Sequence, residues 1–213
     1  MIETVAAFMR DGGIFMYIIL VVSVVGAAIV VERGYVLLLK FNVDSRLLWE
    51  NVSRHILEGD MEKAAALCKG SGVPLLRLLN AGISASGSSR SDIQDAVDEV
   101  AVEIIPSIDR RLNHLATLAN VATLLGLLGT IQGLIQSFSA VGIADPSQKA
   151  AILASGISIA LYTTFFGLIV AIPMLIAYTF FHAKAMRIID EMDEFSIKLM
   201  NLTKRMKDAA QAK

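Results

Sequence analysis

Three long stretches without a charged residue constrain this chain more than any other feature. Residues 14–31, 115–144 and 150–181 contain no Asp, Glu, Lys or Arg. Each stretch reaches or exceeds the roughly 18–20 apolar residues that cross a bilayer as one helix. A backbone in lipid must satisfy its hydrogen bonds within the segment, which a helix does. The sequence therefore predicts an all-α membrane protein with three transmembrane helices.

The Lys and Arg residues predict how these helices are oriented. Of the 19, only Arg10 and Lys149 lie before the first stretch or between the second and third. Lys and Arg gather on the cytoplasmic side, so the N-terminus is expected outside and the two long polar segments inside. The first stretch lacks the basic leader of a signal peptide, and we interpret it as an uncleaved span. We therefore expect an outer-surface amphipathic segment over 1–13, transmembrane helices over 14–40, 115–144 and 150–182, a cytoplasmic helical segment over 41–114, a periplasmic hairpin over 145–149 and a cytoplasmic helical tail over 183–213.

Local start and stop signals divide the polar segment 41–114 into helices. Ser, Thr, Asp and Asn cap helix N-termini, and Gly commonly ends helices. Residues 84–89, "SASGSS", predict a loop. The expected signals are Asp44 or Ser45 as an N-cap, Gly59 as a stop, Asp60 as an N-cap, Gly70 as a stop, and Ser91 with Gln94 as a capping box.

Two apolar periodicities predict long helices beyond the membrane. From Ile93 to Leu115, apolar residues recur every three or four positions, which predicts a helix that runs straight into the second span with a kink at Pro106. From Ile188 to Met206, the same spacing forms a heptad seam. This seam packs against helix 91–115 or copies of itself, or else the tail lies flat on the membrane surface.

Small residues form a continuous stripe along one face of the second stretch. This face lacks the large apolar side chains expected of a lipid-facing surface. Small side chains let helix backbones approach closely in a membrane. The stripe serves either simple helix packing or a narrower, functional surface. It comprises Ala116, Ala119, Thr123, Gly126, Thr130, Gly133, Ser137, Ala140 and Ala144, with a shorter counterpart of Gly156, Ala160, Thr164, Gly167 and Ala171 in the third stretch.

The spans lack an ionisable group of the kind that ion-coupled pumps need at membrane depth. If this protein moves ions, the titrating group must come from another chain. His114 and His182 stand at the ends of their spans, either as proton relays or as ordinary interfacial residues. We see no catalytic motif, cofactor motif, metal cluster or nucleic-acid signal, and therefore expect no enzyme activity, no cofactor and no metal. The single Cys68 excludes an internal disulfide.

The two long spans resemble the MotA/TolQ/ExbB proton-channel family. The resemblance lies in "LATLANVATLLGLLGTIQGLIQSF" and "ASGISIALYTTFFGLIVAIPMLIAY", and the size and three spans are similar to its ExbB/TolQ branch. It implies an ion-driven motor in a bacterial inner membrane, in which a homopentamer around a central pore encloses two copies of an ExbD/TolR-like single-span partner. The partner carries the titrating aspartate, and ion flow past it produces mechanical work on the cell envelope.

The resemblance also implies which residues line the ion path. The family's pore threonines correspond to Thr130 and Thr164. With the small face turned inward, the lining further includes Thr123, Gly126, Gly133 and Ser137 of the second span and Ala160 and Gly167 of the third.

The chain departs from the family at three positions. It has Thr123 where many relatives have proline, Gln132 where many have a bulkier or different residue, and Ile159 where ExbB and TolQ proteins have glutamate. The last departure leaves the choice between protons and sodium open. Alternative functions are a self-contained secondary transporter, a passive membrane scaffold and, within the family, a gliding or polymer-transport motor.

Overall fold

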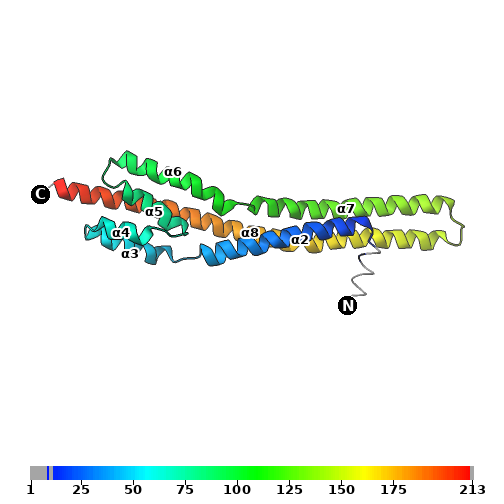
Figure 1. Ribbon diagram of the computed structural model, residues 1–213. Coiled ribbons are helices and arrows are strands. Elements are labelled where there is room, and N and C mark those ends of the chain that lie inside the picture. Colours follow the sequence, from blue (N-terminus) through cyan, green and yellow to red (C-terminus); the bar gives the residue numbers. More distant parts are fainter. Residues whose placement is uncertain (1–8, 10–11, 212–213) are drawn as a thin grey trace. The chain divides into compact units, whose positions relative to one another are not determined.

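The computed structural model describes Met9 and residues 12–211, without the side chains of 210 and 211. All regular secondary structure in this part of the chain is helical (Figure 1). Three helical segments are long and apolar enough to cross a membrane, Ile14–Lys40, Arg90–Ile143 and Lys149–Ala209. This confirms the three spans predicted from the charge-free stretches. The amphipathic segment expected over 1–13 falls mostly outside the described residues.

The chain divides into two units, and the first comprises the residues up to Glu32 together with Arg111–Phe180. Its helices are α2 (Ile14–Tyr35), α7 (Leu112–Ile143) and the N-terminal half of α8 (Lys149–Gln211). A short turn joins α7 to α8, where the Gln148 N–H donates to the Asp145 carbonyl at 2.9 Å. α8 continues through Pro173 as one helix. α2 packs against α8, since a side chain on Gly26 would come within 2.1 Å of Met174.

The chain leaves helical geometry between α6 (Arg90–Asp109) and α7, which corrects the expectation of one helix kinked at Pro106. Pro106 lies inside α6. The break falls at Arg111, whose φ of 64° is left-handed and is the single positive φ of a non-glycine among the described residues. The Arg111 guanidinium pairs with the Glu32 carboxylate in the same unit. A tertiary ion pair therefore accompanies the break, and no local sequence rule could have placed it there.

The second unit comprises Arg33–Arg110 and the residues from Phe181 onward. Asp44 accepts hydrogen bonds from two backbone N–H groups of α3, and Asp60 accepts one from Lys63 in α4, which confirms both predicted caps. Gly59 and Gly70 have φ values of 80° and 76°, as expected of helix-ending glycines. The helical elements, beside α6 and the end of α8, are a π-helical turn η1 (Val36–Lys40), α3 (Ser45–Leu57), α4 (Met61–Cys68) and α5 (Pro74–Ser84).

The capping box predicted at Ser91 and Gln94 was wrong by two residues. Ser89 caps α6, accepting from the Asp92 N–H at 3.2 Å while its own N–H donates to Asp92 Oδ2 at 2.9 Å. Aspartate at the third helical position thus takes the role that Glu or Gln usually has. Gln94 instead donates to Asp98 one turn further on.

The tail seam is buried within this chain, which decides how it is used. Phe195 and Leu199 are 2% and 0% exposed and join the core formed by α3, α4 and α5. Trp49 of α3 packs on Phe195 with ring centroids 5.7 Å apart. The C-terminal half of the seam therefore packs against these shorter helices. α6 also borders α8, as expected of helix 91–115, because Ile93 lines a pocket together with Met200 and Thr203.

Candidate functional site

The contact between α7 and α8 brings the small residues of both spans together. A Cβ atom on Gly126 would lie 3.1 Å from the Thr163 carbonyl oxygen and from Thr164 Cα. A Cβ atom on Gly167 would lie 2.7 Å from the Ala122 carbonyl oxygen. Because these neighbours are backbone atoms, they cannot move aside like the end of a side chain. The glycines therefore allow the two helices to approach at backbone distance.

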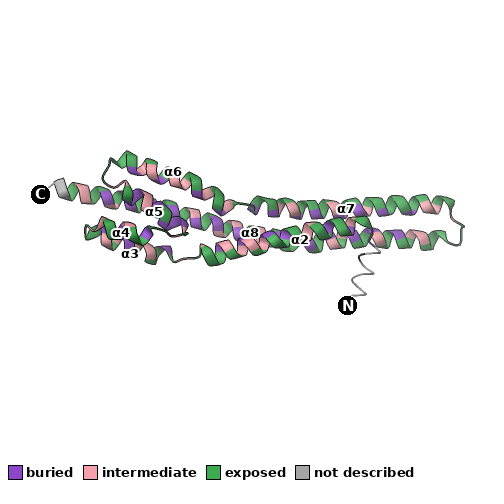
Figure 2. Ribbon diagram, in the orientation of Figure 1, coloured by how far each residue is buried: buried purple, intermediate pink, exposed green. Residues whose placement is uncertain are grey.

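The buried line of α7 shares Ala119, Gly126, Gly133 and Ser137 with the predicted stripe and differs from it between these positions. Buried and exposed residues alternate along α7 in Figure 2, and Ala122 and Gly129 are buried where the stripe has Thr123 and Thr130. Each threonine lies about 100° around the helix from its buried neighbour, since successive residues are separated by that angle. The buried line comprises Leu112, Leu115, Ala119, Ala122, Gly126, Gly129, Gly133 and Ser137.

The two threonines of α7 lie at the edge of this contact, with Thr123 exposed and Thr130 half-buried. The Thr123 hydroxyl donates to the Ala119 carbonyl at 3.1 Å, and the Thr130 hydroxyl donates to the Leu127 carbonyl at 2.5 Å. Both bonds stay within α7. Each oxygen keeps lone pairs that can accept from a group outside the chain.

Thr164 makes a hydrogen bond that joins the two helices. Its hydroxyl donates to the Gly126 carbonyl at 3.0 Å. Since Thr123, Thr130 and Ser137 bond within α7, Thr164 is the one predicted hydroxyl that links α7 to α8. It thus combines a polar group at membrane depth with a structural role.

Thr163 is a contact that the sequence analysis missed. It is 1% exposed, and its hydroxyl donates to the Ala160 carbonyl at 2.8 Å. A Cβ atom on Gly129 would lie 2.5 Å from the Thr163 hydroxyl oxygen. The available signal was the adjacent pair Thr163-Thr164, in which one side chain fills the contact and its neighbour borders it.

The contact continues toward the α7–α8 turn with the remaining predicted residues. Gly133 lies against Ala160, at 3.2 Å from a Cβ atom placed on the glycine. Ser137 is buried and donates to the Gly133 carbonyl at 2.8 Å, and a Cβ atom on Gly156 would overlap its hydroxyl. The structure thus brings all eight predicted site residues to the α7–α8 contact or its edge. Their role in lining a pore stays a prediction.

Charged groups are confined to the ends of the spans. His182 Nδ1 lies 3.8 Å from Asp109 Oδ1, both in the second unit. His114 is exposed, and Ile159 is half-buried. Within the described residues no group of three His, Cys, Asp or Glu side chains could hold a metal ion.

Comparison with known families decides what kind of protein carries this site. The model of the MotA/TolQ/ExbB proton channel family matches residues 71–194, which include α7 and most of α8. The chain belongs to this family. Family membership and the three long apolar helices together make it a multi-pass membrane protein.

Individual relatives indicate the ExbB/TolQ-like branch of the family. An ExbB homolog of Methanothermobacter thermautotrophicus, described as a biopolymer transport protein, is 29% identical over 195 residues, covering 91% of this chain and 67% of that protein. An ExbB-like protein of Synechocystis is 28% identical over 177 residues, covering 83% and 84%. The Tol-Pal system protein TolQ of Haemophilus influenzae is 39% identical over 74 residues, covering 35% and 32%.

Proposed function

We propose that this chain is the channel subunit of an ion-driven motor that converts proton or sodium motive force into mechanical work on the cell envelope. Two features of α7 and α8 together support this proposal. Their membrane-length stretches contain no ionisable Asp, Glu, Lys or Arg, yet they present threonine hydroxyls beside a backbone-tight contact. A single-span partner of the ExbD/TolR type supplies the titrating aspartate.

The proposed assembly has five copies of the chain around a central pore that holds two partner helices. It lies in the inner membrane with residues 41–114 and 183–213 in the cytoplasm and 145–149 outside. The close α7–α8 packing supports this arrangement because it makes the two helices a stiff wall for a pore. Native mass spectrometry in mild detergents tests it, and a monomer throughout would contradict it.

The threonines are proposed to stabilise the ionised form of the partner's aspartate. A carboxylate in a low-dielectric site favours its neutral form unless something hydrogen-bonds the charged one. Thr130 and Thr164 can turn their hydroxyls toward the carboxylate or hold a water beside it. They do so without adding a fixed charge, which would trap the ion.

The test replaces each hydroxyl by a methyl group of the same shape. Thr130→Val and Thr164→Val should leave the oligomer and partner binding intact and reduce ion flux at least tenfold, with Thr130 the more sensitive. Thr179→Val is the matched control, since Thr179 is exposed on α8 and donates to its own helix at Leu175, outside the small face. Wild-type flux in both test variants would mean that the ion path lies elsewhere. Flux through the chain reconstituted without a partner would instead favour a self-contained transporter.

A further inference from the structure

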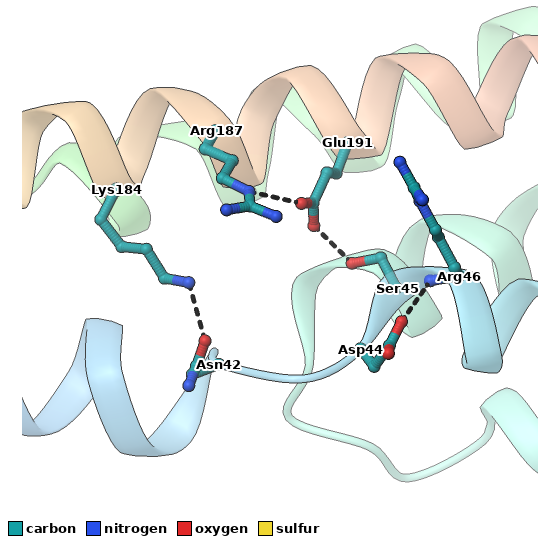
Figure 3. Close-up of polar contacts among 7 residues, drawn as sticks. All are labelled: Asn42, Asp44, Ser45, Arg46, Lys184, Arg187 and Glu191. Atoms are coloured by element: carbon teal, nitrogen blue, oxygen red, sulfur yellow. Dashed lines mark hydrogen bonds and ion pairs between the residues drawn. The ribbon is translucent and has the colours of Figure 1, made fainter.

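A polar pocket in the second unit lies where η1 gives way to α3 and faces α8 (Figure 3). Its volume is about 530 Å³. Residues 42–46 form one side, and Arg187, Glu191, Glu194 and Phe195 form the other. The pocket is separate from the α7–α8 contact, because all its lining residues belong to the second unit.

Hydrogen bonds hold the two sides of the pocket together. The Ser45 hydroxyl donates to Glu191 Oε2 at 2.5 Å, and Arg187 Nε donates to Glu191 Oε1 at 3.0 Å. Lys184 Nζ donates to Asn42 Oδ1 at 2.7 Å (Figure 3). Both oxygens of Glu191 are therefore engaged, and the Arg187 side chain is fixed through Nε with its two terminal nitrogens unbonded to any described residue.

Each carboxylate of the pocket accepts hydrogen bonds from described residues. Asp44 Oδ1 accepts from the backbone N–H groups of Arg46 and Leu47. Glu194 accepts from Lys198 Nζ at 2.5 Å, and this bond, followed by the charge of Lys198 and a weaker contribution from Arg46, holds the pKa of Glu194 below its usual range. With Glu194 balanced by Lys198, Asp44 and Glu191 remain against Arg46, Arg187 and the neighbouring Lys184.

The cations of the pocket have donors to spare. The Arg46 side chain is exposed and makes no hydrogen bond or ion pair with a described residue. Lys184 is not a lining residue but borders the pocket through Asn42, whose neutral amide is the one group that its Nζ contacts among the described residues, and the Arg187 side chain is 72% exposed. Guanidinium groups match the geometry of phosphate oxygens in a bidentate manner. The three cations therefore fit a phosphate group.

The chain positions these cations at the end of two membrane-crossing segments. The first candidate span ends at Lys40. The charge-free stretch of α8 ends at Phe181, three residues before Lys184, or about 4.5 Å along a helix. Leu38 and Leu39 of η1, four and three residues before Asn42 in the chain, are 37% and 71% exposed. Exposed apolar side chains thus lie in the segment that connects the first candidate span to the pocket.

We propose that this pocket binds the phosphate headgroup of an anionic phospholipid. Arg46, Lys184 and Arg187 contact the phosphate oxygens, and Leu38 and Leu39 lie along an acyl chain. Basic pockets at the ends of transmembrane helices are suited to such headgroups. The lipid then fastens the residue 41–44 linker to α8. Nothing in this proposal depends on the ion path, so either can fail without the other.

The test is native mass spectrometry of the delipidated full chain titrated with phosphatidylglycerol, with phosphatidylcholine and inorganic phosphate as separate ligands. We expect one phosphatidylglycerol per chain to bind before any further lipid. Arg46→Gln and Arg187→Gln should each weaken this binding about tenfold, the scale of a lost charge-assisted contact. Arg54→Gln is the matched control, because Arg54 also lies on α3, is 61% exposed and pairs only with Glu50.

Three results would overturn the proposal. Equal phosphatidylglycerol binding by all variants would mean that the lipid is an unspecific annulus. Phosphatidylcholine binding as tightly would exclude recognition of net negative charge. Inorganic phosphate that displaces the lipid at millimolar concentration would make the pocket a site for a free anion. If Arg46→Gln loses its helical circular dichroism signal, Arg46→Lys is the second variant. It keeps the positive charge but lacks the bidentate guanidinium group, and it should retain part of the affinity.

Discussion

Alanine at Gly167 tests the packing of α7 on α8. The added Cβ atom would lie 2.7 Å from the Ala122 carbonyl oxygen and 3.2 Å from Gly126 Cα. Both neighbours belong to the backbone of α7, and non-bonded heavy atoms prefer separations of about 3.5–4.0 Å. The helices must therefore separate by at least about 0.5 Å, and the neighbouring bond from Thr164 to Gly126 lengthens with them.

The expected cost follows from these two effects. Overpacking of a tight contact typically costs about 1–3 kcal/mol, and an interhelical hydrogen bond in a membrane protein contributes about 0.6 kcal/mol. The higher helix propensity of alanine returns up to about 1 kcal/mol. We expect a net loss of roughly 0.6–2.6 kcal/mol in the free energy of unfolding.

Thermal unfolding in detergent, followed by circular dichroism, measures this loss against a matched control. Gly142 also lies on α7, but a Cβ atom there meets nothing within 4 Å. Gly142→Ala should therefore be neutral or slightly stabilising, while Gly167→Ala lowers the melting temperature. Equal melting temperatures for the two variants would refute the backbone-distance contact between α7 and α8.

Four further predictions follow from single residues. Burial raises the pKa of the Cys68 thiol to about 11; since only the thiolate reacts, maleimide should label Cys68 slowly near neutral pH and faster as the pH approaches that value, and rapid labelling of the folded chain at pH 7 would be inconsistent with its burial. Because Cys68 stays silent through burial, membrane topology is better read from exposed positions: Ser147→Cys should react with an impermeant reagent from outside and Glu99→Cys should not, and the reverse pattern would invert the orientation. Ile159→Ala should leave ion-driven work largely intact, and its complete loss with normal assembly would assign this half-buried residue an unforeseen role. Ser89→Ala should destabilise the first turn of α6 by about 1 kcal/mol, seen as faster amide exchange there, and unchanged exchange would show that the capping box is dispensable.

Features that depend on neighbouring residues along the chain could be predicted from the sequence alone. The three spans follow from uninterrupted apolar stretches. A segment in lipid must satisfy its backbone hydrogen bonds internally, and a helix does so. The structure confirms the predicted caps at Asp44 and Asp60 and the predicted stops at Gly59 and Gly70. These features could be predicted because each depends on a few adjacent backbone groups. The motifs of the second and third spans together also indicated the family, which the family model confirms.

Features that depend on distant residues were decided by the tertiary structure. The helix break falls at Arg111, which pairs with the distant Glu32, and the apolar periodicity from Ile93 to Leu115 continues through the break without a local signal. The stripe of small residues predicted a contact face on α7 but not which residues lie at its centre. Threonine and glycine are both small, so the sequence does not distinguish them. The position of α8 determines that Gly129, and not Thr130, is buried. Thr163 therefore fills the contact beside Gly129, whereas Thr130 stays at the edge, where its hydroxyl donates to Leu127 within α7.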